Sequence, residues 1–144
     1  MAEIALQAAQ KAITARLTAN PNELWGNRVR VSLAKSNTSY PYVIYFWSGG
    51  GESNTVRAQD SSLRIAVKCI SSKMAEAMRG AARISELLND CGKQDDAGDY
   101  LYGGDDWEIL SITEEEVIYL PEQQADTITA YHVGAFYRFE MQHT

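Results

Sequence analysis

The sequence predicts an α+β domain in which two helices pack on one face of an antiparallel-rich mixed sheet, in the order α-β-β-β-α-β-β. Two segments repeat apolar residues at the helical period, and several others alternate apolar and polar residues as half-buried strands do. The chain has 144 residues and is 45% apolar. We therefore expect a single domain, residues 1–144, whose core needs no metal or disulfide.

Two helices are expected from the apolar periodicity. The first should span residues 3–18 and stop before Asn20 and Pro21, because proline cannot continue a helix. One stripe of it is apolar: Leu6, Ala9, Ile13 and Leu17. The second should span residues 74–88, with an apolar face of its own: Met74, Ala77, Met78, Ala81, Ile84 and Leu88. We interpret the Met and Ala side chains of this face as core packing.

Three strands are expected between the helices, over residues 28–33, 42–47 and 63–70. The triple glycine that follows the second strand resembles a phosphate-binding loop. Such a loop needs a helix directly after its glycines, because the free N–H groups of the first turn attract the anion. Here a strand follows, so we expect a hairpin loop over residues 48–62. This loop contains Gly49, Gly50, Gly51, Glu52 and Arg57.

The C-terminal third contains an acidic loop and further strands. Residues 93–106 are rich in Asp and Gly and show no period, which predicts a loop. Strand pieces are expected at 107–112 and 117–120, on either side of a bend or bulge at the acidic triplet 114–116. The last strand, residues 131–142, alternates clearly, with Phe136 as the exception to its polar face.

Charge is distributed unevenly along the chain, whose net charge is −6. Residues 1–88 carry 11 basic and 6 acidic side chains, a net charge of +5, whereas residues 89–116 carry 1 and 10, a net charge of −9. Such a segment is either a solvated acidic loop or an electrostatic contact surface. The candidate contact residues of this segment are five aspartates: Asp95, Asp96, Asp99, Asp105 and Asp106.

The second strand predicts a contact with another subunit. Its residues are apolar on both faces, and helices cover only one face of the sheet. The second face therefore needs another cover, since a large exposed apolar patch usually marks an interface. The predicted interface combines apolar residues of this strand with basic residues of its neighbours: Tyr42, Ile44, Phe46, Arg30, Arg64 and Lys68.

No pattern in the sequence points to catalysis or to a cofactor. His132 and His143 belong to no metal-binding spacing, and no GxSxG motif accompanies them. Cys69 and Cys91 are expected to be buried free thiols. No run is long enough for a membrane span, and the N-terminus lacks a signal-peptide layout. We expect a protein that is not an enzyme and contacts no membrane.

The order of these motifs resembles the tail completion or tail terminator proteins of long-tailed bacteriophages. The resemblance covers nearly the whole chain. It rests on the opening helix, the Ala-rich second helix, the closing strand and three quoted motifs: "NRVRV" at 27–31, "YPYVIY" at 40–45 and "LRIAVKCIS" at 63–71. The proline that starts the aromatic strand is the most specific feature.

The resemblance implies a structural virion protein at the head–tail junction, assembled in the host cytoplasm. Its subunits would form a ring, commonly of six, on the last ring of the major tail tube protein. The hairpin loop with Gly49, Gly50, Gly51, Glu52 and Arg57 would dock against that tube ring. The ring would end tube polymerisation and present a docking surface to the head–tail connector protein. DNA would pass through the lumen without specific binding. A head-completion stopper, a small host adaptor and an enzyme on the same fold are the alternatives.

Overall fold

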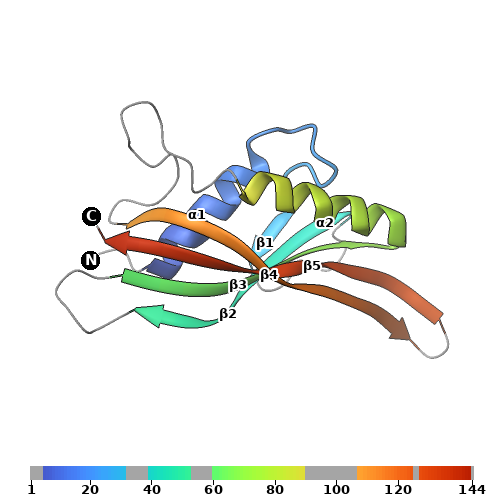
Figure 1. The fold of residues 1–144 in the computed structure, drawn as a ribbon. Helices are drawn as coiled ribbons and strands as arrows, with labels where there is room; N and C mark the ends of the chain where they lie inside the picture. The colour runs from blue at the N-terminus through green and yellow to red at the C-terminus, as the bar shows by residue number, and fades with distance from the viewer. Residues whose placement is uncertain (1–4, 32–38, 53–59, 90–106, 125–126, 144) are drawn as a thin grey trace.

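The computed structural model describes residues 5–31, 39–52, 60–89, 107–124 and 127–143. Its elements are α1 (Ala5–Thr18), β1 (Val29–Val31), β2 (Tyr42–Glu52), β3 (Asp60–Ser71), α2 (Met74–Leu88), β4 (Trp107–Gln124) and β5 (Thr127–His143). The predicted α+β class and the order α-β-β-β-α-β-β are confirmed. Both helices lie on one side of the sheet (Figure 1).

The five strands form one mixed sheet in the order β1-β2-β3-β5-β4. The β1–β2 pair is parallel, and the other three pairs are antiparallel. The main core lies between the sheet and the helices. Its largest buried side chains come from all parts of the chain: Trp25, Tyr45, Trp107, Tyr137 and Phe139. Most of the apolar surface removed from water by folding is therefore on this one face of the sheet.

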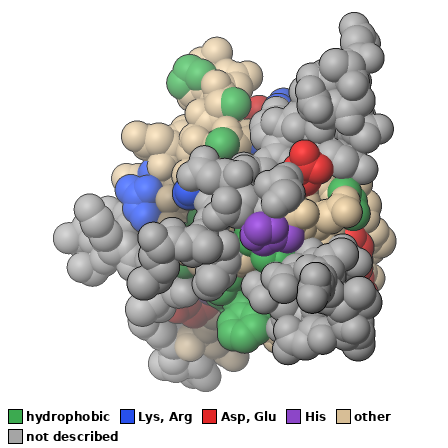
Figure 2. Space-filling view, turned by 90° about the vertical axis from the view of Figure 1, so that its left-hand side faces the viewer, with side chains coloured by type: hydrophobic (Ala, Val, Ile, Leu, Met, Phe, Trp, Pro, Cys, Tyr) green, Lys and Arg blue, Asp and Glu red, His purple; other side chains and the backbone are tan. Residues whose placement is uncertain are grey.

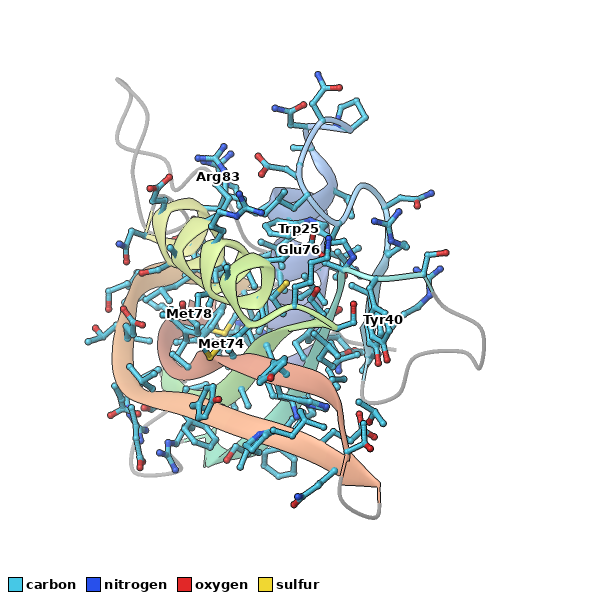
Figure 3. The ribbon with its side chains drawn as sticks, turned by 90° about the vertical axis from the view of Figure 1, so that its right-hand side faces the viewer. Trp25, Tyr40, Met74, Glu76, Met78 and Arg83 are labelled. Carbon is cyan, nitrogen blue, oxygen red and sulfur yellow. The ribbon has the colours of Figure 1, made fainter. Side chains whose placement is uncertain are left out.

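Helix α1 packs closely because its buried stripe is mostly alanine. Ile13 and Leu17 on that stripe are fully buried. The segment after the helix is fixed by Trp25, whose indole N–H donates to the Leu17 carbonyl at 2.8 Å. Glu23 then binds Arg83 of α2, with the closest N–O distance at 2.8 Å. Figure 3 shows Arg83 and Trp25 near one another in the upper part of the view, beside α2.

Helix α2 buries only part of the predicted face, namely Ala77, Ile84 and Leu88. Its buried residues are Ala77, Gly80, Ile84, Leu87 and Leu88. Met74 and Met78, predicted to be core, are 45% and 53% exposed. The reason is Gly80, which brings the helix directly against β3 and turns the methionine side toward the open edge of the sheet. At the start of the helix, the Ser71 hydroxyl accepts the backbone N–H of Lys73 at 3.1 Å.

Two strand assignments also differ from the prediction. Residues 49–52 belong to β2 and pair with Arg64, Leu63, Ser62 and Ser61, so the glycines are not the tip of a hairpin loop. A register shift between Trp47 and Gly49 lets the glycine-rich backbone continue the ladder. The two pieces expected around the acidic triplet are one strand, β4, with a bulge between Glu114 and Glu116.

Candidate functional site: the outer face of the sheet

The face of the sheet that carries no helix is called here the outer face. The strand register places side chains in rows across it. One row runs through Arg30, Ile44, Lys68, Gly134 and Ile118, one residue from each strand. A neighbouring row contains Phe46 and Phe136, and the neighbouring row on the other side contains Tyr42. The six residues predicted for a subunit interface therefore share this face.

Part of this face is covered by the chain itself. Ile44 is only 8% exposed and packs with Ile70, Ala130 and Tyr42 in a small second cluster. Ile44 is therefore covered mostly by its own chain, and its place in a subunit interface stays a prediction. Ile70 of β3 and Ala130 near the start of β5 supply this cover. Phe46 remains half-buried.

Lys68 lies at the centre of the outer face and is 9% exposed. Its ammonium lies 5.4 Å from the centre of the Phe46 ring, which is a cation–π distance. Burial lowers the pKa of Lys68, and the negative charge of Glu122 opposes that change. Among the described residues, no carboxylate oxygen lies within ion-pair distance of this ammonium.

A groove of about 300 Å³ opens beside Lys68. It is lined mainly by apolar side chains: Phe46, Lys68, Val117, Ile118, Tyr119, Leu120 and Phe136. A second hollow of about 330 Å³ adjoins it, sharing Lys68 and Leu120, and reaches Glu122 and His132. Gly134 lies next to Lys68 in the ladder, so no side chain fills the floor between them.

Gly134 is required at that position by the backbone. A Cβ built on it would lie 2.7 Å from the Cα of Lys68 and would also collide with the carbonyl of Val67. Atoms at this separation overlap, so any larger residue would push β5 away from β3. The glycine thus allows the close approach of β5 to β3 beside Lys68.

The other end of the outer face is ionic and internally paired. Arg64 binds Glu116 at 3.1 Å and lies 3.9 Å from the centre of the Phe136 ring. Arg138 binds Glu115 at 3.2 Å. The acidic triplet, predicted only as a bend or bulge, therefore neutralises two basic side chains of the outer face. At this end the exposed charges already have partners.

The sheet edge at β4 exposes an apolar surface that the sequence analysis missed. The hairpin arm is defined here as residues 117–124 of β4 and 127–133 of β5; Figure 1 shows it extending at the right. Its exposed apolar side chains are Val117 at 70%, Tyr119 at 50%, Leu120 at 54% and Ile128 at 44%. Met74 extends this surface, because its sulfur accepts the Tyr119 hydroxyl at 3.5 Å. Figure 3 shows Met74 and Met78 between α2 and the strands.

Several predicted site residues lie outside the described residues: Arg57, Asp95, Asp96, Asp99, Asp105, Asp106 and the second cysteine, Cys91. Cys69 is a buried free thiol. Figure 2 looks onto one end of the molecule, where the coloured basic and acidic side chains are scattered rather than gathered into one patch.

The described part of the chain contains no cluster of three or more His, Cys, Asp or Glu side chains that could hold a metal. His132 lies on the outer face, where its Nε2 is 3.3 Å from a Glu122 oxygen. Within the same residues, no helix is both long and apolar enough to cross a bilayer.

The fold is shared with a protein chain in the solved structure of the virion of a native gene transfer agent (GTA) particle. The two chains superpose with a TM-score of 0.75 over 98% of this chain and 99% of the other, at 13% sequence identity. At that identity the match establishes the fold. Neither models of protein families nor curated protein sequences match this chain.

Proposed function

We propose that this protein is a structural component of a phage-like virion, and that it acts as a tail terminator. Its subunits form a ring, expected to be a hexamer, on the end of the tail tube. The ring ends polymerisation of the tube protein and offers a docking surface to the head–tail connector. The role is one of association and needs no catalytic residue.

The observation that carries the proposal is the shared fold, which covers almost the full length of both chains. The other chain belongs to a virion particle, in which each protein works by contacting its neighbours. The motifs at 27–31, 40–45 and 63–71 independently resemble tail terminators. Fold similarity alone is an analogy, so the proposal also needs surfaces on this chain that are suited to contacts between subunits.

Two distinct surfaces of the described chain suit a ring. A head-to-tail ring needs two different patches on each subunit, because a patch that pairs with itself closes a dimer. The hairpin arm offers an exposed apolar patch with Val117, Tyr119 and Ile128. The outer face offers the second, with Phe46 and Lys68 beside a groove. Val117 and Tyr119 border both patches, whereas Ile128 belongs only to the arm, and Phe46 and Lys68 belong only to the outer face.

The acidic segment, residues 90–116, is proposed to face either the lumen or the connector. Carboxylates lining a lumen would repel the DNA phosphates and keep the genome from sticking. Contact with a basic surface of the connector would instead weaken as ionic strength rises. Replacing Asp95, Asp96, Asp99, Asp105 and Asp106 with Asn separates the two roles, since only the second requires these charges for joining.

A head-completion stopper is the second candidate, because it belongs to the same class of virion joint proteins. The deciding experiment mixes the purified protein with tail tubes and, separately, with portal-side complexes, and examines both by negative-stain microscopy. A terminator produces rings on tube ends and stops further addition of tube subunits. Binding to the portal side alone would identify a stopper, and binding to neither would contradict the proposal.

A further inference from the structure

Three basic side chains of the outer face, Arg64, Arg138 and Lys68, differ in how their charge is balanced. Arg64 and Arg138 each bind a carboxylate, at 3.1 Å and 3.2 Å. Lys68 is more buried than either, yet no carboxylate in the described chain reaches ion-pair distance of it. Buried cations in proteins are usually paired, because an ammonium removed from water loses much of its hydration energy.

Within the described part of the chain, the surroundings of Lys68 supply part of the missing stabilisation but no counter-ion. The Phe46 ring contributes a cation–π contact at 5.4 Å. The charge of Glu122 acts on Lys68 from beyond ion-pair distance. The Glu122 carboxylate itself lies 3.3 Å from the Nε2 of His132. An anion that enters the groove from outside would therefore meet an ammonium to which no carboxylate of the described chain is already bound.

The groove itself selects for a ligand that is mostly apolar. Its walls are the rings of Phe46 and Phe136 and the side chains of Ile118 and Leu120, and its volume is about 300 Å³. That space is suited to one aromatic or branched aliphatic side chain. The adjoining hollow, which also reaches Lys68, leaves room for the chain that carries it.

We propose that this groove binds a segment of another virion protein in which a carboxylate lies next to an aromatic or branched aliphatic side chain. The apolar side chain fills the groove, and the carboxylate pairs with the Lys68 ammonium. The choice of a virion protein as partner rests on the proposed function, whereas the chemistry of the groove does not. Charge complementarity and apolar burial together provide the specificity.

A second copy of this chain fits the groove less well. In the described residues an exposed carboxylate stands beside an exposed apolar side chain at Glu116–Val117, and Val117 borders the groove of its own subunit. A copy that inserted this segment would receive the same segment in return. Such a contact is two-fold and closes a dimer, so it cannot build a ring.

The test uses two small probes of equal shape, 3-phenylpropionate and its neutral amide, 3-phenylpropanamide. Each is titrated into the isotopically labelled full-length protein and followed by amide NMR shifts. We expect the acid to bind at least tenfold more tightly than the amide, with shifts around Phe46, Lys68 and Leu120. Equal binding of the two probes, or shifts elsewhere on the molecule, would overturn the proposal.

Three variants make the test specific to Lys68. Lys68→Met should bind both probes equally, and Lys68→Arg should keep the preference for the acid. Lys73→Met makes the same change at an exposed lysine and should behave like the parent. If Lys68→Met does not fold, Lys68→Arg and Lys73→Met are compared with the parent instead. The groove proposal fails if neither the parent nor Lys68→Arg binds the acid more tightly than the amide.

Sedimentation of the same samples identifies the occupant. If the protein alone forms a dimer that 3-phenylpropionate dissociates and Lys68→Met abolishes, the groove holds a second copy and the assignment to another virion protein is wrong. If rings cap tubes but neither probe binds, the groove proposal fails and the terminator role survives. If the acid binds selectively but tubes are not capped, the terminator role fails and the anion-binding groove stands.

Discussion

Gly80 of α2 rests directly on Cys69 of β3. A Cβ built on Gly80 would lie 2.8 Å from the Cys69 Cβ and would collide with its sulfur. Two carbons never approach this closely without repulsion, so the glycine fixes the distance between helix and sheet. This contact also sets the rotation of α2, which buries Ile84 and leaves Met78 exposed.

Replacing Gly80 with alanine should destabilise the protein by about 1–3 kcal/mol, as expected for overpacking in a core. At an exposed helical site the same change would stabilise by about 1 kcal/mol, because alanine is the better helix former. The sign of the change in unfolding free energy, measured with urea, therefore shows whether Gly80 is packed tightly against Cys69. Ala82→Gly on the exposed side is the control and should lose about 1 kcal/mol through propensity alone. A stabilised Gly80→Ala variant would contradict the packing described.

The Cys69 thiol should be almost inert in the folded protein. Burial raises its pKa from 9.0 to about 12, and Glu76 adds to that rise. The thiolate is the reactive species, so at pH 8 its population falls about a thousandfold relative to an ordinary thiol. Alkylation with iodoacetamide, followed in a Cys91→Ser variant, should be slow in buffer and fast in urea. Native rates within tenfold of the unfolded rate would show that Cys69 is accessible.

Stability should decrease above pH 10, in part because of Tyr137. Burial raises the pKa of its phenol from 10.0 to about 12, with a contribution from Glu114. Between these pH values the unfolded chain has lost a proton that the folded chain keeps, so the free energy of unfolding falls as pH rises. One such proton corresponds to about 1.4 kcal/mol per pH unit. Below pH 10 both states are protonated and the effect is absent.

The Tyr137→Phe variant tests this assignment. It should lose stability less steeply than the parent between pH 10 and 12, as measured by urea unfolding at several pH values. Tyr119→Phe, which changes a half-exposed side chain, is the control and should follow the parent. If the slopes of the parent and Tyr137→Phe coincide, the phenol does not carry the raised pKa.

The helices and the order of elements along the chain were predictable because the periodicity of each segment is local. Ile13 and Leu17 recur at helical spacing, and the alternation of 63–70 specifies a strand wherever it is placed in the sheet. The ends of β4 and β5 were not predictable in this way. Residues 121–124 are mostly polar and the alternation over 127–130 is too short to be decisive; the two segments become strand because they pair with each other.

The predicted site residues share the outer face because of pairings between distant parts of the chain. Sequence alternation could show that Ile44 and Lys68 avoid the helices, but not that Ala130 covers Ile44 or that Glu115 binds Arg138. Those contacts depend on β5 lying between β3 and β4. The groove was missed for the same reason, since Gly134 and Leu120 meet Lys68 only in the assembled sheet.

The hairpin arm should be required for ring assembly, and Ile128 isolates its contribution. This side chain is 44% exposed and is not among the residues that line the groove. Ile128→Asp should leave the unfolding free energy nearly unchanged, because exposed substitutions usually shift it by less than about 0.5 kcal/mol. A carboxylate buried in a subunit contact loses water without gaining a partner, so each contact should weaken by several-fold or more.

Thr127→Asp is the matched control, because it places the same charge one residue away without removing an apolar side chain. Sedimentation velocity and tube capping should therefore separate the two variants: Thr127→Asp assembles like the parent, and Ile128→Asp remains dissociated and leaves tubes open. If both variants fail equally, added charge at the hairpin end is the cause, and the apolar contact is not. If Ile128→Asp forms rings and caps tubes as the parent does, the arm does not lie between subunits, and the ring must be built from other surfaces of the chain.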